Sequence, residues 1–432
     1  DIADMQVEVN QPQSTPFVVG TRSQNTSWKD LSSNGNDAPL TNAPVFEEES
    51  KALNFDGEDQ YATIASDAAF TVNTRTVEMT FKMNGTYANF SPLATYANGS
   101  STSNRIWLGL QNSKWQMHGW GTTDPTATTT IIADGWYTCV FSYNGNAVQQ
   151  MKLYTNGQLE STTTNTQGGV VGVAGNNWYL ATIPGGWQSQ TYSAMSINSF
   201  KVYSKILTDD EVKHNYFGGS IVTDNLVCAF DAGNLISYES GSTTAYSLTG
   251  SIDSTLTNGV DFTFDNGGSW VFDGTNDYID APLTQSFTTA LTVETWYKGT
   301  DSGRNHLWNF NDSSNNLNCN FNDGSYTLWL YWEGNGSNYL RFTSPQFCDG
   351  EIHHIVFVHE GSTNKVYLDG VLLTNGVAGG TQSFTGIVGS TYDIGGSPYF
   401  EGNVYINRVY NSSLTATEVQ QNYIANQSRF SS

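Results

Sequence analysis

Short segments in which apolar and polar residues alternate recur along the whole chain. Clear examples are 76–82, 137–143, 292–298 and 352–358. A period of two is typical of a strand that has one face against a core and the other toward solvent. Asn156-Gly157 and Asp369-Gly370 stand between such segments, where they supply the positive φ angles that tight hairpins need. The pattern therefore predicts two packed antiparallel sheets joined by hairpins.

Each half of the chain also carries one helix signal near its end. Thr208 with Glu211, and again Thr415 with Glu418, have the spacing of a capping box. In this motif the Thr hydroxyl accepts a hydrogen bond from a free backbone N–H group, while the Glu carboxylate reaches back to the cap residue. One short helix is therefore expected at the end of each half.

The same series of blocks occurs twice in the chain. The block 53–61, which contains Phe-Asp-Gly, returns as 270–278. Further blocks return in the same order: 76–78 as 292–294, 152–157 as 365–370, and 207–216 as 414–423. Collinear matches of this kind indicate a duplicated domain. The join is expected near 215–224, which is too short to be a long flexible tether.

Composition agrees with a β-rich fold and limits the partners. Aromatic residues make up 13% of the 432 residues, and Lys and Arg total only 17. The net charge of −23 repels nucleic-acid phosphates and anionic membrane surfaces. No apolar run approaches the length of a membrane span. Neither nucleic-acid binding nor membrane insertion is therefore expected.

The four cysteines do not have the spacing of a zinc site. Cys139 and Cys228 stand inside apolar stretches and are expected to be buried small hydrophobic residues. Cys319 and Cys348 have no equivalents in the first half. They are interpreted either as a disulfide within the second half or as free thiols.

Several segments of the second half carry a family resemblance. They are Leu-Val-Cys-Ala-Phe-Asp-Ala-Gly-Asn at 226–234, Phe-Asp-Gly-Thr-Asn-Asp-Tyr-Ile at 272–279, the strand pair 349–356 and 365–370, and the closing strand and helix at 406–419. Together they resemble the laminin-G-like, concanavalin A-like lectin/glucanase superfamily. The first half matches through 28–36, 55–57 and its own closing helix, but it departs from the pattern at 10–18, where the opening strand is expected.

The resemblance implies an all-β fold of two tandem concanavalin A-like (laminin-G-like) jelly-roll β-sandwiches, each closed by a short helix. Jelly roll 1 would span 21–219 and jelly roll 2 would span 220–432. Residues 1–20 would form either a divergent first strand or an N-terminal arm that anchors the protein. The superfamily contains lectins, hydrolases and spacers, so the fold does not by itself fix the function.

No catalytic residues are predicted. Glycoside hydrolysis needs two carboxylates across the scissile bond, and the hydrolases of the superfamily carry them as alternating acids on one strand. That spacing is absent from the sequence. Glu78 and Glu294 stand singly in predicted strands, and both are expected to face solvent. Enzymatic activity is therefore not expected.

Exposed aromatic residues are the candidates for sugar binding, because a ring can stack on the apolar face of a pyranose. Trp120, Trp187 and Trp332 are selected as the carbohydrate-binding residues. Most other tryptophans are expected to fill the cores. The wider set of tryptophans considered is Trp115, Trp178, Trp308 and Trp329.

A calcium site is considered at Asp231, Asp273 and Asp277, since members of the superfamily often hold this ion at the rim of the sandwich. The alternative for Asp273 is a turn residue whose side chain bonds its own backbone. His353, His354 and His359 are interpreted as structural, because 353 and 359 lie too far apart along one strand to share an ion.

The segments Asp-Ala-Gly-Asn at 231–234 and Phe-Asp-Gly-Thr-Asn-Asp-Tyr at 272–278 are similar to modules common in virion proteins of tailed phages and in bacterial surface proteins. With the two-domain build and the missing catalytic pair, this resemblance implies a non-enzymatic structural or display protein on the surface of a virus particle: a phage capsid decoration, head fibre or tail-associated protein. Its partners would be other virion structural proteins, in an oligomeric or multicopy assembly, and host surface glycans. The alternative is a secreted bacterial carbohydrate-binding protein or adhesin, extracellular or on the cell surface. A glucanase is a more remote alternative. No cofactor is expected apart from calcium.

Overall fold

The computed structural model describes residues 26–430 with several gaps. The gaps are 33, 48–49, 99–104, 120–123, 146–149, 165–173, 186–190, 251, 284, 301–304, 312–315, 323–326, 333–337, 381–386 and 388–390. The chain divides into two compact units, unit 1 (Asp1–Phe217) and unit 2 (Gly218–Ser432), and each is described by itself.

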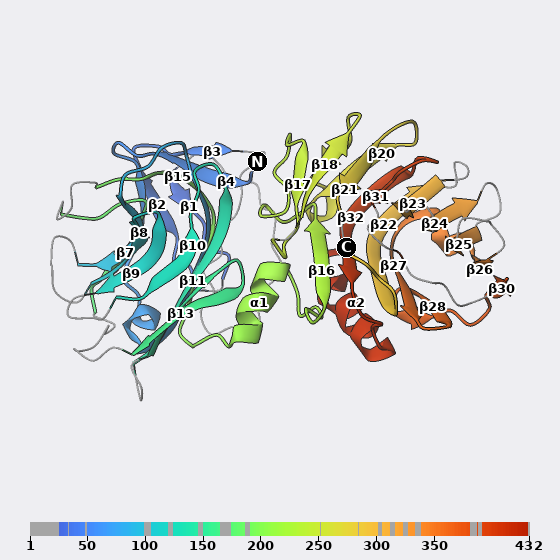
Figure 1. The fold of residues 1–432 in the computed structure, drawn as a ribbon. Helices are drawn as coiled ribbons and strands as arrows, with labels where there is room; N and C mark the ends of the chain where they lie inside the picture. The colour runs from blue at the N-terminus through green and yellow to red at the C-terminus, as the bar shows by residue number, and fades with distance from the viewer. Residues whose placement is uncertain are drawn as a thin grey trace. The chain divides into compact units, whose positions relative to one another are not determined.

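Unit 1 is a sandwich of two antiparallel sheets (Figure 1). The eight-stranded sheet has the order β1 (Ser27–Trp28), β2 (Ala38–Thr41), β5 (Tyr61–Ile64), β14 (Asn177–Leu180), β7 (Phe90–Ala97), β8 (Ile106–Gln111), β9 (Lys114–Gly119) and β10 (Thr126–Thr130). The seven-stranded sheet has the order β13 (Gln158–Thr164), β12 (Gln150–Thr155), β11 (Trp136–Asn144), β6 (Thr74–Met83), β15 (Ala194–Tyr203), β4 (Ala52–Asp56) and β3 (Val45–Glu47).

Unit 2 repeats this jelly-roll architecture. Its nine-stranded sheet has the order β17 (Thr244–Tyr246), β18 (Asp253–Thr257), β21 (Tyr278–Ala281), β31 (Thr391–Ile394), β23 (Asn305–Asn311), β24 (Leu317–Asn322), β25 (Thr327–Trp332), β26 (Asn338–Thr343) and β30 (Val377–Gly379). The other sheet has the order β19 (Asp261–Thr263), β20 (Ser269–Asp273), β32 (Glu401–Tyr410), β22 (Ala290–Thr300), β27 (Asp349–Glu360), β28 (Thr363–Leu368) and β29 (Val371–Leu372), and β16 (Leu226–Asp231) also pairs with β32.

The alternating segments of the sequence are strands, as predicted. The segments 76–82 and 292–298 lie in β6 and β22, at the centres of their sheets. The predicted hairpin turns are also present: Asn156 and Gly157 have φ values of 49° and 76°, and Asp369 and Gly370 have 50° and 78°. Two consecutive positive φ angles are the signature of the type I′ turn, whose twist matches that of paired strands.

A separate hydrophobic core fills each sandwich. Phe55, Phe81 and Trp178 are fully buried in unit 1, and Phe272, Trp270 and Trp308 are buried in unit 2. All four cysteines are buried free thiols, so the disulfide considered for Cys319 and Cys348 is not formed. Burial raises the pKa of the Cys139 and Cys228 thiols, as expected for small apolar core residues.

One α-helix closes each unit, α1 (Asp209–Phe217) and α2 (Ala416–Phe430). Both predicted capping boxes are confirmed. The Thr208 hydroxyl accepts from Glu211 N at 3.2 Å while Glu211 accepts from Thr208 N at 2.8 Å, and Thr415 and Glu418 do the same at 3.3 and 2.7 Å. Short 3₁₀ helices cover Ala68–Thr71, Asp265–Gly267 and Pro345–Phe347. No helix in the described part of the chain is long and apolar enough to cross a membrane.

The two units differ at their opening strand. In unit 2, β16 pairs with the second half of β32, from Ile406 to Tyr410. No strand among the described residues of unit 1 occupies the matching edge of β15. The predicted arm or divergent first strand at 1–20 lies outside the described residues.

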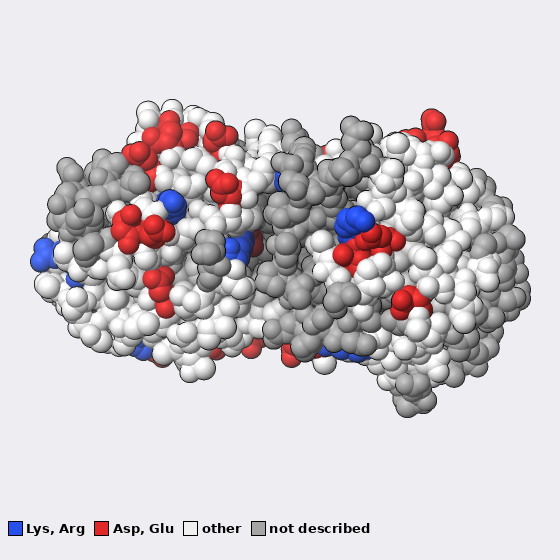
Figure 2. All heavy atoms as spheres, turned by 180° about the vertical axis from the view of Figure 1, so that it is seen from behind, with Lys and Arg blue, Asp and Glu red and all other residues white. Residues whose placement is uncertain are grey.

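Acidic side chains stand in several separate groups on the face drawn in Figure 2, among a larger uncharged surface. This distribution agrees with the sequence, in which the acidic residues are spread along the chain. On this face the charge therefore acts as a diffuse field and does not mark one site.

Candidate functional site

The structure corrects one of the three tryptophans selected from the sequence. Trp332 is 1% exposed and packs in the core of unit 2, so its ring cannot stack on a sugar. Trp120 and Trp187 lie outside the described residues. Of the wider set of tryptophans considered, Trp115, Trp178 and Trp308 also lie in the cores.

The three aspartates considered for calcium do not assemble into one site. Asp231 is paired with Arg429, whose Nη1 atom lies 2.7 Å from Asp231 Oδ1. Asp273 accepts from the backbone N–H of Thr275 at 2.8 Å, which is the turn role, and its own N–H donates to Asp277 Oδ2 at 3.1 Å. Among the described residues, no three His, Cys, Asp or Glu side chains come together to hold a metal.

The histidines have the structural role predicted for them. His353 lies between Asp369 and Asp349, with ring nitrogens 2.8 and 3.2 Å from their carboxylates. Burial lowers the pKa of His353, but these two carboxylates outweigh it and the net shift is upward. His359 Nδ1 lies 2.8 Å from Asn364 Oδ1, and His354 is fully buried.

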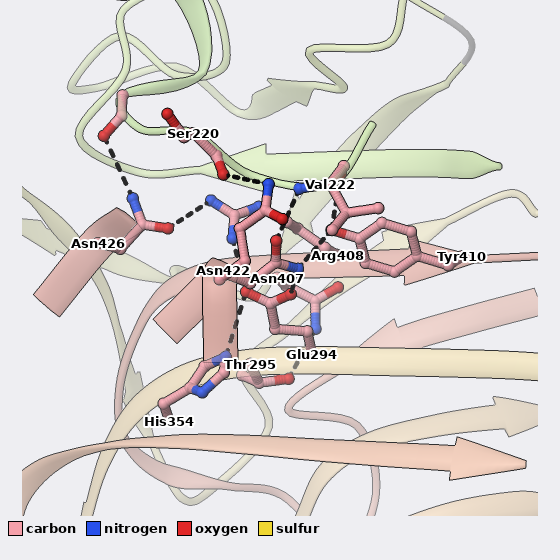
Figure 3. Close-up of polar contacts among 12 residues, drawn as sticks. Ser220, Val222, Glu294, Thr295, His354, Asn407, Arg408, Tyr410, Asn422 and Asn426 are labelled. Atoms are coloured by element: carbon pink, nitrogen blue, oxygen red, sulfur yellow. Dashed lines mark hydrogen bonds and ion pairs between the residues drawn. The ribbon is translucent and has the colours of Figure 1, made fainter. Parts of the chain in front are cut away.

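Glu294 lies at the centre of a buried polar cluster beneath α2 (Figure 3). Its carboxylate accepts from Arg408 Nη1 and from Asn422 Nδ2, each at 2.6 Å, and His354 Nε2 lies 3.2 Å away. Burial raises the pKa of Glu294, but the charge of Arg408 and the hydrogen bonds outweigh it and bring the pKa to about 2. Glu294 is therefore a buried anion.

The same cluster fixes the chain that enters unit 2. The backbone N–H of Val222 donates to Asn422 Oδ1 at 2.7 Å, and the hydroxyl of Tyr410 donates to the carbonyl of Val222 at 3.2 Å. Gln421 Nε2 donates to the carbonyl of Ser220 at 2.8 Å (Figure 3). The segment 220–222 is thus attached to α2 and β32 by both backbone and side-chain contacts.

Unit 1 has an equivalent cluster around Glu78, which is 2% exposed. Lys201 Nζ and Asn215 Nδ2 lie 2.9 and 2.7 Å from its carboxylate. The prediction that Glu78 and Glu294 face solvent is therefore wrong. Each side chain does point away from the core between the sheets, but the closing helix covers that face, which a strand pattern alone does not reveal. Neither carboxylate can reach a polymeric substrate.

The outer face of the nine-stranded sheet of unit 2 is turned away from the core and is only partly open, since Asn318, Tyr331 and Tyr339 are half-buried while Asn309 and Asn320 are buried. Side chains that are opposite in register form one continuous row across seven strands, here called the polar row. Its members, from β21 to β30, are Asp280, Asp393, Asn309, Asn318, Tyr331, Tyr339 and Gly379. From Asp280 to Tyr339, residues next to each member along its strand, such as Ile279, Leu330 and Leu340, lie in the core, so these six members share one face.

Three aromatic side chains and one arginine gather at one end of the polar row. We call this group the aromatic platform; its members are Trp329, Tyr331, Tyr339 and Arg341. Trp329 and Tyr331 are parallel within 3°, with ring centroids 5.2 Å apart, and Trp329 lies 4.9 Å from Tyr339. The guanidinium of Arg341 lies 4.8 Å from the centroid of the Trp329 ring. All four side chains are half-buried. Packing against one another limits their rotamers, so a ligand would meet a rigid surface.

Sequence reasoning considered Trp329 but chose Trp332. The strand β25 reads Thr-Leu-Trp-Leu-Tyr-Trp, and Leu328 and Leu330 are buried. Trp332 stands two residues after Leu330, so it points to the same face as the two leucines, into the core. Trp329 and Tyr331 alternate with the leucines and point to the opposite face. The alternation itself could have identified the exposed pair.

The corresponding face of unit 1 has a different chemistry. By its place in the sheet order, β9 corresponds to β25, and its outward residues are Lys114, Gln116 and His118. On the neighbouring strand β8, Trp107 is fully buried and faces away from the core. Among the described residues of β9 and β10, unit 1 presents no aromatic platform.

Unit 2 also has a cavity of about 440 Å³ at the ends of β16, β21 and β32. Its lining includes the apolar residues Leu226, Ile252 and Leu283 and the polar residues Asn225 and Gln285. It contains neither a charged group nor an aromatic ring, so its lining offers less for recognition than the outer face does.

Comparison with known proteins agrees with the fold. The family model of the concanavalin A-like lectin/glucanases superfamily matches residues 56–213 and 273–420. The LG4-5 domains of mouse laminin alpha1 are 14% identical over 87% of this chain and 94% of that chain, with a TM-score of 0.31. The CBM40 of the Ruminococcus gnavus IT-sialidase, solved with alpha2,3 sialyllactose, is 16% identical over 38% of this chain and 96% of its own, with a TM-score of 0.32. No curated protein matches the sequence.

Proposed function

Because this chain belongs to the concanavalin A-like lectin/glucanase superfamily, we propose that it is a non-enzymatic display protein that binds glycans through the outer face of unit 2. Its fold is that of carbohydrate-binding lectins. The observation that carries the proposal is the aromatic platform at the end of the polar row. A flat pair of rings can stack on the apolar face of a pyranose, while carboxamide and carboxylate groups beside it bond the hydroxyls.

The non-enzymatic part of the proposal follows from the positions of the carboxylates. Glu78 and Glu294 are buried under the closing helices and bonded there. Asp280 and Asp393 are direct neighbours on adjacent strands of the polar row, and they are not the alternating acids on one strand that the resemblance implies for the hydrolases of the superfamily. Hydrolysis requires carboxylates that flank the scissile bond from two sides. The release of reducing ends from any glycan, and its loss in Asp280→Asn or Asp393→Asn, would contradict the proposal.

We place this display on the surface of a virus particle, with a tailed phage as the most suitable setting. The support is the tandem build, which suits multivalent presentation. The alternative remains a secreted bacterial adhesin. Mass spectrometry of purified particles distinguishes them, because a virion protein is recovered with the capsid and tail proteins and an adhesin is recovered with the cell surface or the medium.

A glycan array tests the binding itself. The intact protein should bind a defined set of glycans, and Trp329→Ala should lose this binding without loss of folding. Phe264→Ala is the matched control, because Phe264 is an exposed aromatic residue of unit 2 that precedes η2 (Asp265–Gly267) and lies outside the nine-stranded sheet. Binding that is equal in both variants, or no binding by the wild-type protein, would reject the proposal.

A further inference from the structure

An exposed apolar edge lies at the end of one sheet of unit 2. β29 is the last strand of that sheet in the part of the chain that the structure describes, and its two side chains, Val371 and Leu372, are 64% and 42% exposed. The next residue, Leu373, donates its N–H to the carbonyl of Val366 at 2.9 Å. Alternate residues of an antiparallel strand bond to the same neighbour, so the N–H and C=O groups of Leu372 point away from β28. The edge therefore presents both apolar side chains and backbone groups.

The helix α2 extends this edge with further uncharged side chains. A Cβ atom placed on Gly370 would lie 2.7 Å from Gln420 Oε1, so the helix runs directly beside the turn that leads into β29. Ile424 stands one turn after Gln420, on the same side of the helix, and is 60% exposed. From Val419 to Ser428 the helix carries no charged residue. We call this surface the uncharged edge; its members are Val371, Leu372, Gln420 and Ile424.

Unit 1 carries charged groups at the same place in the repeat. When the matched blocks are continued, Glu160 stands where unit 2 has Leu373, and Lys213 stands where unit 2 has Gln420. The Glu160 carboxylate accepts from two backbone N–H groups of β10 at 2.6 and 2.9 Å, so it ties β13 to β10. Charged side chains and covering contacts protect a sheet edge from pairing with another chain. Unit 1 has this protection, whereas unit 2 has uncharged side chains at both positions.

We infer that the uncharged edge pairs with the same edge of a second copy of this chain. In an antiparallel pair centred on Leu372, the two copies would exchange both backbone hydrogen bonds of that residue, which is the self-complementary arrangement of a twofold dimer. Charge selects this occupant. Each copy carries a net charge of −23, so two copies repel each other except where uncharged surfaces meet. A basic partner would instead be attracted to the acidic groups elsewhere on the surface.

The inference does not rest on glycan binding, but it adds a consequence to it. A dimer would hold two aromatic platforms on one body, and two binding faces raise the avidity for a surface that carries many ligands. The paired edges are short, so the contact belongs among the small specific interfaces, and we expect a dissociation constant in the micromolar range.

Sedimentation velocity of the full chain tests the dimer. From about 1 to about 200 µM the mass should change from one chain to two, and added NaCl should strengthen the association because it screens the like charges. Leu372→Lys and Ile424→Lys should each raise the dissociation constant by about tenfold or more. Leu159→Lys is the matched control, because Leu159 stands at the position of Leu372 in unit 1 and is 43% exposed. It should leave the dissociation constant unchanged.

The opposite outcomes would overturn the inference. A mass of one chain at every concentration and salt level would show that the edge does not pair. A dimer that Leu159→Lys weakens as much as Leu372→Lys, or that neither variant of unit 2 weakens, would place the contact elsewhere. Growth beyond two chains would reject the twofold pairing. None of these readings uses a glycan, so a failure of the dimer and a failure of the proposed function are told apart.

Discussion

Unit 1 and unit 2 are alike beneath their closing helices and differ on their outer faces. Under the helix, each unit buries a glutamate that is bonded to a cation and an asparagine: Glu78 with Lys201 and Asn215, and Glu294 with Arg408 and Asn422. On the outer face, unit 2 presents the aromatic platform, whereas β9 of unit 1 presents Lys114, Gln116 and His118. The comparison teaches that the two units share their helix-docking contacts while their outer faces differ.

The largest effect is expected from removing the buried glutamate of unit 2. Glu294→Ala leaves Arg408 buried without its partner and should cost about 3–5 kcal/mol of the free energy of unfolding of unit 2. Glu78→Ala should cost unit 1 less, because the side chain of Lys201 is 14% exposed and can reach water. Calorimetry of the full chain measures both transitions. Equal losses in the two units would show that exposure of the cation does not set the cost.

Trp332 and Trp329 give a second comparison within one strand. Trp332→Ala opens a cavity in the core of unit 2 and should cost about 3–5 kcal/mol of stability. Trp329→Ala should cost less stability than Trp332→Ala, since the Trp329 ring is half-buried outside the core, and it should weaken glycan binding at least tenfold. Urea unfolding and titration with the array ligand separate the two effects. A large loss of stability in Trp329→Ala would make that ring a packing residue.

Acid should destabilise unit 2 through Glu294. Its pKa is about 2 in the folded unit, against an ordinary value of 4.5. A lowered folded-state pKa contributes stability that is present above pH 4.5 and is lost as the pH falls toward 2, by about 3 kcal/mol. Urea titrations across this range measure the loss, and Glu294→Gln should flatten it. A parallel decline in the wild-type and variant proteins would assign the acid sensitivity to other groups.

The smallest effect is expected where the units are most alike. Thr208→Ala and Thr415→Ala each remove the hydroxyl that accepts from the N3 backbone N–H, and each should cost about 1 kcal/mol. Thermal unfolding of the two variants, with the serine substitutions as controls, measures the cost. A loss in only one unit would show that the two helices contribute unequally to their sandwiches.

Local patterns in the sequence predicted most of the fold. The alternation in 76–82 and 292–298, the Asn-Gly and Asp-Gly turns and the two capping boxes each act within a few residues, and all are present. The burial of Glu294 could not be read from its strand, because α2, more than 100 residues later, covers it. Its cation, Arg408, is likewise distant in sequence and arrives through strand pairing.

The polar row was hidden for the same physical reason. Asp280, Asn309 and Tyr331 come from separate strands, and only the register of the sheet brings them onto one line. A one-residue slip in any strand would turn its side chain to the opposite face. The choice between Trp329 and Trp332, in contrast, could have been made from the sequence alone. Trp332 falls on the same face of the strand as the apolar Leu328 and Leu330, and Trp329 falls on the other.

The attachment of 220–222 to the closing helix has a mechanical consequence. Tension applied to the chain where it enters unit 2 is met first by the hydrogen bonds of Ser220 and Val222 to Gln421, Asn422 and Tyr410. The bonded residues 220–222 precede β16 in the chain. The force therefore reaches α2 and β32 before it can pull β16 away from β32. Unit 2 therefore carries a clamp at its entrance, and a pull on the chain there would have to break these side-chain bonds before it could unfold the sheet.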